Sequence, residues 1–310
     1  MIATVTLNPA LDKSVYLEEL RPHDANRIIK IEVDAGGKGV NASRVLKELG
    51  SETLALGFVG GRTGSFIEHV LKGEGIPTDF VRIRSDTRTN ISVQETSGLP
   101  PTMLNEPGPP ISDEELGLLV GKVEDIAPRS QIVVFGGSIP TGVPADIYRK
   151  LVRIVREAGA RAILDSDGEP MRLGLAAVPF MIKPNRDEVR RLLGLEIKSL
   201  NDSARAVGLF RNMGVEIAVI SMGSDGAVAG SSEGAWHAIP PKVKPVSTIG
   251  SGDSMIAGIA HVLCAGGTLD EALRWGTAAG AANAMTNGAE ICRRGQVVEL
   301  LDRVRVSQIG

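Results

Sequence analysis

The stretch STIGSGDSMIAGIAHVL, residues 247–263, places small residues and a carboxylate directly before an apolar run with helical spacing. A helix N-terminus carries unpaired N–H groups and the positive end of the helix dipole, so it attracts anions. The common role of Ser251 or Asp253 at such a position is to cap the helix. This stretch alone is therefore compatible with a helix cap or with an anion site, and the rest of the chain must decide.

Length and composition are those of an ordinary globular protein. The chain has 310 residues, of which 43% are hydrophobic and 23% charged, and we expect one domain over residues 1–310. The formal net charge of −3 and the lack of a Lys/Arg run argue against a nucleic-acid partner. No secretory signal and no stretch of about 18 uncharged apolar residues occurs, so we expect a cytoplasmic protein without a membrane partner.

Short β-branched runs alternate with amphipathic stretches along the chain. This alternation is typical of βαβ units, which build a parallel sheet covered by helices on both faces. The expected strands are 2–7, 53–60, 131–137, 161–168 and 216–223, and the expected helices are 40–50, 64–75 and 144–159. Beyond residue 250 the pattern is helical to near the end.

Residues 13–33 and 88–104 break this pattern. Both alternate polar and apolar residues with turn residues between, which predicts antiparallel strands outside the main sheet. We expect these two insertions to form a small β lid. Arg27 and Arg88 flank its strands, and two arginines that converge on one pocket would suit a substrate phosphate.

Several polar residues follow the expected strands, where ligands of open α/β sheets bind. Asp12 follows the first strand, and the glycine-rich segment DAGGKGVN (34–41) is neither a Walker loop nor a dinucleotide fingerprint. Judged alone, that segment is as compatible with a helix-capping turn as with a ligand loop. Ser138 and Asp165 each follow an apolar strand and fit either a turn residue or a site residue.

A further segment, MIKPNRDEV (181–189), contains Lys183, Asn185 and Glu188. The three-residue spacing of Asn185 and Glu188 is that of a reciprocal helix cap. The same pair of oxygen ligands could instead hold a hydrated Mg²⁺ ion. The sequence leaves both roles open.

The order of these motifs resembles that of the ribokinase-like (PfkB) carbohydrate kinase family. The motifs are AGGKGVNASRVLKELG (35–50), VGGRTG (59–64), GGSIP (136–140), KPNRDE (183–188) and STIGSGDSMIAG (247–258). Each is weak alone, but together they span nearly the whole chain. The resemblance implies a three-layer α/β sandwich with a mostly parallel central sheet and a small β lid.

The resemblance also implies roles for individual residues. Asp253 would be the catalytic base, and the N–H groups of Gly250, Ser251 and Gly252 would bind the transferred phosphoryl group. Substrate-binding residues would be Asp12, Gly37, Lys38, Asn41, Arg27, Arg88 and Ser138. Lys183 and Asn185 would bind ATP, and Asn283 would lie near its adenine. The turn SMGSDGA would also bind the nucleotide, through Ser221, Gly223, Ser224 and Gly226. Asn185 and Glu188 would organise Mg²⁺ through water, and loops near Ser247, Ile249 and Gly288 would hold a monovalent cation such as K⁺.

Within the family, the chain is similar to the kinases of ketohexose phosphates. These are the 1-phosphofructokinases, tagatose-6-phosphate kinases and minor 6-phosphofructokinases. Some 6-phosphofructokinases carry a further arginine where Met103 stands here, and the segment LNEPGP (104–109) is closer to the 1-phosphofructokinases. We therefore expect fructose 1-phosphate as substrate, with fructose 6-phosphate and tagatose 6-phosphate as alternatives, and a homodimer formed through the lid.

Two readings from other classes compete with the kinase. A sugar-phosphate-binding regulator on the same fold could dispense with Asp253, which this chain keeps. A nicotinamide-dependent oxidoreductase would carry GxGxxG after the first strand, where this chain has LNPALD (7–12). The retained aspartate and the missing fingerprint both favour the kinase.

Overall fold

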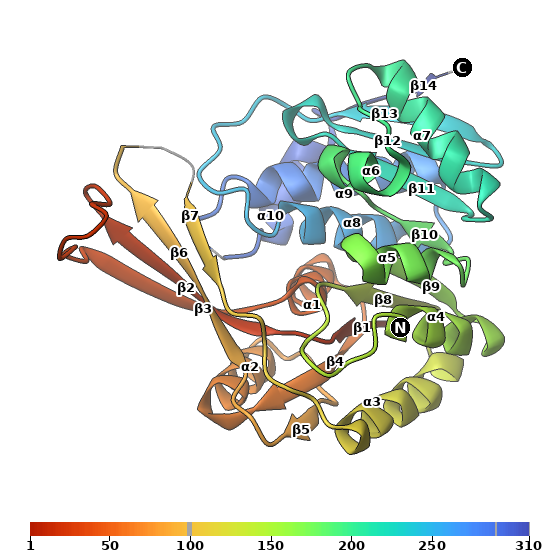
Figure 1. The fold of residues 1–310 in the computed structure, drawn as a ribbon. Helices are drawn as coiled ribbons and strands as arrows, with labels where there is room; N and C mark the ends of the chain where they lie inside the picture. Colours follow the sequence, from red (N-terminus) through yellow and green to blue (C-terminus); the bar gives the residue numbers. More distant parts are fainter. Residues whose placement is uncertain (98–100, 289, 310) are drawn as a thin grey trace.

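A ten-stranded sheet forms the centre of the part of the chain that the computed structural model describes, namely residues 1–97, 101–288 and 290–309 (Figure 1). Its strand order is β14-β13-β12-β11-β10-β9-β8-β1-β4-β5. The strands from β11 to β5 are parallel, and β12, β13 and β14 continue the sheet antiparallel at one edge. The bounds are β1 Ile2–Thr6, β4 Thr53–Gly60, β5 Val81–Ile83, β8 Ile132–Gly136, β9 Arg161–Asp165, β10 Met181–Ile182, β11 Ile217–Ser221, β12 Ala227–Ser231, β13 Gly234–Ile239 and β14 Arg305–Ile309.

Helices cover both faces of this sheet, because its central strands are apolar on both sides. In β8, for example, Val133 and Phe135 belong to one buried cluster while Ile132 and Val134 belong to the other. The first cluster includes side chains of α3 (Asp113–Ile126), α4 (Ile147–Glu157), α5 (Gly168–Leu175), α6 (Arg186–Leu193) and α7 (Leu200–Asn212). The second includes α1 (Lys38–Leu49), α8 (Ser251–Cys264), α9 (Leu269–Asn283) and α10 (Arg294–Leu301), and α2 (Gly61–Gly73) packs beside α1 in a smaller cluster.

A second sheet of four strands projects from the body (Figure 1). Its strand order is β3-β2-β6-β7, with bounds β2 Ala10–Leu17, β3 Lys30–Gly36, β6 Arg88–Glu95 and β7 Thr102–Asn105. The sequence predicted antiparallel strands in these two insertions, although β2 begins before residue 13 and β3 extends beyond residue 33. Within each insertion the strands are antiparallel, but β2 and β6, which join the two insertions, pair parallel, so the prediction is wrong for that pair. We call this element the small sheet.

The expected strands and helices occur within a few residues of their predicted bounds. The sequence pattern did not single out β12, β13 or β14, which extend the sheet after its parallel part. None of the helices in the described ranges has the length and apolar character that crossing a bilayer requires.

Helices α8 and α9 pack unusually closely, because glycines face each other at their contact. A Cβ atom on Gly258 would lie 2.7 Å from the carbonyl oxygen of Trp275, and one on Gly276 would lie 2.6 Å from Ile259. Each contact excludes even a methyl group. Helix α8 begins at the glycine-rich loop 250–252, and α9 ends at Asn283, so this pair of helices fixes both segments in the body.

Candidate active site

A cavity of about 340 Å³ lies between the body and the small sheet. The body contributes loops at the carboxyl ends of its parallel strands and the first turns of α1 and α8, which is where an open α/β sheet places its ligand. The cavity brings together nine of the residues that the sequence predicted: Asp12, Gly37, Lys38, Asn41, Arg88, Ser138, Ile249, Gly250 and Asp253. We call it the central cavity.

Asp253 is the buried carboxylate of the central cavity. It lies in the first turn of α8 with 8% of its surface exposed, and Asn41 donates a hydrogen bond from Nδ2 to its Oδ2 at 2.8 Å. Burial raises the pKa of Asp253 to about 6, against the opposing effect of Lys38. Such a group is ionised at neutral pH and can still accept a proton, as a general base must.

The N-terminus of α8 is left without a side-chain cap. Gly250 occupies the N-cap position with a φ of 76°, and neither Ser251 nor Asp253 caps the helix. The hydroxyl of Ser251 is buried and makes no hydrogen bond. The Ser251 N–H donates to the Thr248 carbonyl at 3.3 Å, whereas the N–H groups of Gly250 and Gly252 have no partner among the described residues and can bind an anion. The alternative in which Ser251 or Asp253 caps the helix is wrong.

Three charged side chains form a group beside this loop, in which Asp165 and Lys183 are buried and Lys38 is partly exposed. Lys38 Nζ lies 3.1 Å from one carboxylate oxygen of Asp165, and Lys183 Nζ lies 3.5 Å from the other. Burial would raise the pKa of Asp165, but the ammonium groups of Lys183 and Lys38 outweigh it and hold the pKa below its usual value. Burial likewise opposes the charge on Lys38, yet the carboxylates of Asp165, Asp253 and Glu188 outweigh it and raise its pKa.

Lys183 also approaches the anion loop. A Cβ atom on Gly252 would lie 3.2 Å from Lys183 Nζ, so the missing side chain leaves room for the ammonium group. Lys183 is 4% exposed, and a buried ammonium group beside free N–H groups creates a positive site. The three features Gly250, Gly252 and Lys183 therefore make this loop attractive to a phosphate.

Asn185 and Glu188 cap α6 reciprocally. The Asn185 oxygen accepts from the Glu188 backbone N–H at 2.9 Å, and the Glu188 carboxylate accepts from the Asn185 N–H at 2.8 Å. The structural role that the sequence left open is thus confirmed. One carboxylate oxygen of Glu188 remains outside the cap, and burial raises the pKa of Glu188.

The expected nucleotide turn lies next to this cap. Ser221 pairs with Asn185 in an isolated parallel bridge, and the short 3₁₀ helix η2 (Gly223–Asp225) follows. Gly223 and Ser224 are exposed, while Gly226 has a φ of 88° and lies so close to Ala238 that a Cβ would be 1.9 Å from its carbonyl oxygen. The structure thus brings Asn185, Ser221 and the turn together at the edge of the body.

Asn283 is bound by the backbone of the protein itself. It is fully buried, its Nδ2 donates to the carbonyl of Ile249 at 2.7 Å, and its Oδ1 accepts from the N–H of Cys292 at 3.1 Å. These bonds hold the loop before Gly250. The adenine contact expected for Asn283 stays a prediction, because these bonds leave one hydrogen of its Nδ2 unused.

The three residues expected around a monovalent cation do meet. Ser247 is buried, its hydroxyl donates to the carbonyl oxygen of Gly288 at 2.9 Å and accepts from the Ile249 N–H at 3.3 Å. The segment 247–249 and the segment around residue 288 therefore lie side by side below the anion loop.

Asp12 lies on the small sheet and lines the central cavity, and its carboxylate packs against Gly36. A Cβ on Gly36 would lie 1.9 Å from Asp12 Oδ2, so only glycine permits this position of the carboxylate. Asn90 donates to Asp12 Oδ1 at 3.0 Å, and burial raises the pKa of Asp12. Arg88 donates to the carbonyls of Glu106 and Asn8, and its Nε remains buried without a partner.

Arg27 is not brought to the central cavity. It is exposed in the loop between β2 and β3, whereas Arg88 lines the cavity. The two arginines therefore do not converge within one copy of the chain. Their residue type suggested a phosphate site, but alternation of strands does not show how far along the sheet each arginine lies.

Sequence reasoning missed several residues of the site. Asp165 was left open between a turn residue and a site residue, and its position directly after an apolar strand was the available signal. The residues that line the central cavity and were missed are Asn8, Lys13, Ser14, Asn90, Ser92 and Asn105. Most lie in the two insertions, where alternation predicted strands but not which face meets the body.

Residues 5–294 match the family model of the pfkB family carbohydrate kinases. The chain belongs to this family. A 1-phosphofructokinase of Borreliella burgdorferi is 37% identical over 310 residues, covering 100% of this chain and 99% of the relative. A 1-phosphofructokinase of Bacillus subtilis is 35% identical over 309 residues and covers 100% of both.

Solved structures agree with the family in fold. Phosphofructokinase-2 of Escherichia coli, in complex with substrates and products, is 30% identical, has a TM-score of 0.93 and covers 97% of this chain and 98% of that one. The same enzyme in complex with potassium gives a TM-score of 0.91 at 30% identity, with the same coverage. This PfkB-family protein is thus a sugar kinase with the ribokinase-like α/β fold, as the sequence predicted.

Proposed function

We propose that this PfkB-family kinase transfers the γ-phosphoryl group of ATP to the free primary hydroxyl of fructose 1-phosphate, forming fructose 1,6-bisphosphate. The observation that carries the proposal is the pairing of a buried carboxylate with an uncapped helix N-terminus. Asp253 lies in the turn whose N–H groups begin at Gly250 and Ser251. A base and an anion site thus stand side by side, as phosphoryl transfer to an alcohol requires.

The proposed step is a direct displacement. The sugar hydroxyl oxygen forms a bond to the γ-phosphorus as the bond to the bridging β–γ oxygen breaks, and ADP leaves with that electron pair. Asp253 accepts the hydroxyl proton, and Asn41 keeps its carboxylate oriented. The N–H groups at residues 250–252 and Lys183 stabilise the negative charge on the transferred group.

Fructose 1-phosphate is favoured over other sugars on two grounds. Both curated relatives described above are 1-phosphofructokinases. In addition, Met103 lines the cavity where a second arginine would be expected for some 6-phosphofructokinases. We propose that Arg88 binds the phosphate already on the sugar, and that Asp12, Gly37, Lys38, Asn41 and Ser138 hold its hydroxyls.

Mg²⁺ fits the residues on the nucleotide side. The oxygen of Glu188 that lies outside the helix cap offers a carboxylate, and Asn185 stands beside it. Within the described ranges, no group of three or more acidic, histidine or cysteine side chains is arranged so that it could hold a metal ion by itself, which suits an ion held mainly by water and phosphate oxygens. When bound, Mg²⁺ would neutralise charge on the ATP phosphates, and Ser221, Gly223, Ser224 and Gly226 would contact the nucleotide.

A monovalent cation fits below the anion loop. The hydroxyl of Ser247 and the carbonyl of Gly288 are oxygen ligands only 2.9 Å apart, and the Ile249 segment joins them to the loop. The Escherichia coli structure with potassium supports K⁺ as the ion. A bound cation would steady the loop that carries Gly250.

A homodimer through the small sheet is supported by its apolar outer face. Ile31 and Leu104 are 46% and 55% exposed and alternate with residues that face the cavity. Exposed apolar side chains gathered on one sheet face mark association surfaces.

A cytoplasmic location stays a prediction from the sequence.

A coupled assay of ADP release across a panel of sugars tests the proposed activity. We expect turnover with fructose 1-phosphate to exceed that with fructose 6-phosphate, tagatose 6-phosphate and unphosphorylated fructose. Preference for either of the other two phosphates would replace the substrate but keep the reaction. Tight binding of fructose 1-phosphate without ADP release would instead identify a sugar-phosphate-binding regulator.

A further inference from the structure

Two rows of side chains cross the small sheet on the face that meets the body. The strand register aligns Asp34, Asp12, Asn90 and Asn105 in the first row, and Glu32, Ser14, Ser92 and Met103 in the second. Residues two apart in a strand share a face, so both rows point the same way. The parts contributed by β2, β6 and β7 line the central cavity.

Asn90 presents an acceptor to the cavity. Its Nδ2 donates to Asp12, and a carboxylate only accepts, so the orientation of the amide is fixed. The remaining Oδ1 is buried and has no partner. Asn41 repeats this arrangement across the cavity, with Nδ2 on Asp253 and an unpaired Oδ1. Two opposite walls thus offer amide oxygens that need a hydrogen-bond donor.

Ser92 adds a hydroxyl in the next row. It is 5% exposed, lines the central cavity, and its Oγ makes no hydrogen bond. A buried polar group without a partner destabilises a fold, so its place needs an explanation. A ligand hydroxyl would supply the missing partner.

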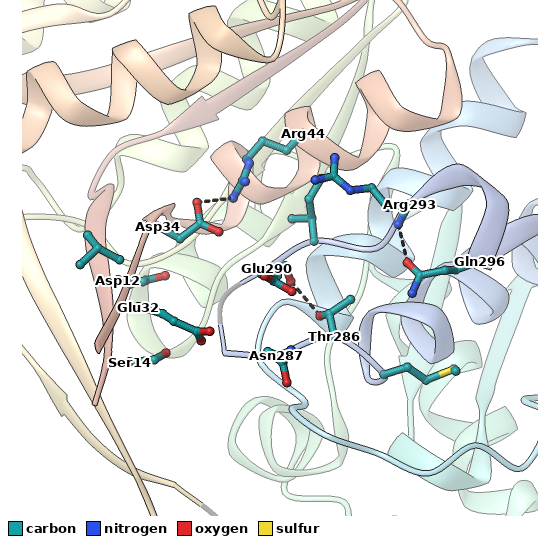
Figure 2. A pocket seen from close by; sticks show the side chains of 13 residues that line it. Asp12, Ser14, Glu32, Asp34, Arg44, Thr286, Asn287, Glu290, Arg293 and Gln296 are labelled. Carbon is teal, nitrogen blue, oxygen red and sulfur yellow. Dashed lines mark hydrogen bonds and ion pairs between the residues drawn. The ribbon is translucent and has the colours of Figure 1, made fainter. Parts of the chain in front are cut away.

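In the neighbouring cavity, the carboxylates of β3 do not lack hydrogen-bond or ion-pair partners (Figure 2). This cavity has a volume of about 570 Å³, shares Asp12 and Ser14 with the central cavity, and is also lined by β3, by residues 285–287, and by Glu290, Ile291, Arg293 and Gln296. Its carboxylates on β3 already have partners, since Arg44 lies 3.0 Å from Asp34 and Tyr16 donates to Glu32 at 2.6 Å. The unpaired groups of the two rows therefore point to a ligand in the central cavity.

We propose that Asn90 and Ser92 form a hydroxyl-recognition subsite on β6, and that they determine specificity for a polyhydroxylated sugar. The Asn90 amide oxygen accepts from one sugar hydroxyl, and the Ser92 hydroxyl bonds a second. Asn90 also positions the Asp12 carboxylate. This inference rests on the proposed function, because it places the sugar phosphate in the central cavity.

The central test is Ser92→Ala. Loss of one neutral hydrogen bond should lower kcat/KM for fructose 1-phosphate by roughly threefold to tenfold, while the melting temperature stays equal or rises because an unpaired hydroxyl is removed. Thr277→Val is the matched control, since the Thr277 hydroxyl is also buried and unpaired but lies in α9 away from the cavity. It should leave kcat/KM unchanged. An unchanged kcat/KM for Ser92→Ala would overturn the subsite.

Substrate analogues separate contact from general damage. Ser92→Ala and wild type are compared on fructose 1-phosphate and on analogues that each lack one hydroxyl. The penalty of the substitution should vanish for one analogue, the one without the hydroxyl that Ser92 binds. An equal penalty for every analogue would show that Ser92 acts only on the fold.

Failure of the proposed function gives a different result. If the wild type releases no ADP with any sugar phosphate, calorimetry measures binding of fructose 1-phosphate directly. Binding that weakens with Ser92→Ala would support the subsite without the kinase reaction, whereas no binding to the wild type would overturn both.

Discussion

The two walls of the central cavity are built from different chemistry. The body wall is ionised, with Lys38 and Lys183 on Asp165 beside Asp253. The sheet wall carries the charged groups of Asp12, Lys13 and Arg88 and adds a row of neutral amides and hydroxyls, such as those of Asn90 and Ser92. Buried charges on rigid strand and helix ends suit the reacting phosphoryl group, whereas neutral polar groups suit discrimination between hydroxyls. Chemistry and selection are therefore assigned to separate elements.

The largest expected effect concerns the charge balance of the body wall. Asp165→Asn would leave the buried ammonium group of Lys183 and the partly exposed one of Lys38 without their carboxylate, which should lower the free energy of unfolding by about 3–5 kcal/mol, mainly through Lys183. Urea denaturation measures the change. Glu169→Gln removes an exposed carboxylate paired with Arg172 and should have no measurable effect. Equal stability of both variants would show that the buried group is not held by its charges.

Asp253→Asn should separate catalysis from binding. Turnover should fall at least about a hundredfold because the base is lost, while binding of the sugar phosphate is retained. The fold should gain stability, since the raised pKa of Asp253 means that ionising it costs more in the folded than in the unfolded chain. The gain should be present above pH 6 and disappear below about pH 4. Retained turnover would remove Asp253 from the mechanism.

On the sheet wall, Arg88→Ala should raise KM for the phosphorylated sugar by about tenfold or more, with little change in KM for ATP. Initial-rate measurements with each substrate varied in turn show the difference. Arg88→Lys keeps the charge but loses the forked donors, so an intermediate KM is expected. Equal increases for both substrates would point to damage through the Asn8 and Glu106 carbonyls that Arg88 also binds.

The pH profile tests the body wall without a mutation. Because Asp253 must be ionised to accept a proton, kcat/KM should rise with pH up to about 6 and level off above it. Below that pH the rate should fall about tenfold per unit. Substitution of Asp253 should abolish this limb in the residual activity. A profile flat to pH 5 would contradict a base with a raised pKa.

The smallest effect on chemistry is expected at the outer face of the small sheet. Ile31→Lys places a charge on the proposed association surface and should shift the chain toward monomer in size-exclusion chromatography with light scattering. Leu118→Lys is the control, because Leu118 is 55% exposed on α3, away from the small sheet. Identical elution of both variants with wild type would place the interface elsewhere.

The sequence predicted the body wall better than the sheet wall. The motifs around Lys38 and Asp253 are continuous in sequence, so their glycines and carboxylates predict the local geometry directly. Asp165 joins Lys38 to Lys183 only because the ends of β9 and β10 meet the N-terminus of α1, which no local pattern shows. Asn90 and Ser92 depend on register and on which face of the small sheet meets the body. A shift of one residue would have turned both outward.

Asn283 shows a different limit. Its residue type and position suited a nucleotide contact but did not show that its buried amide binds the backbone of Ile249 and Cys292. Burial depends on packing of the whole helix pair, so residue type alone could not predict these bonds.

The glycine contact between α8 and α9 prevents the two helices from moving relative to each other. Gly258 and Gly276 let the two helices touch backbone to backbone, so neither can slide along the other without a clash. Asn283 lies at the end of α9, and Ile249 lies just before the start of α8. The close packing of the two helices therefore fixes the distance between these two residues. A methyl group at Gly258 would move the N–H groups proposed to bind phosphate from two turns away, so the core would control the alignment of the reacting atoms.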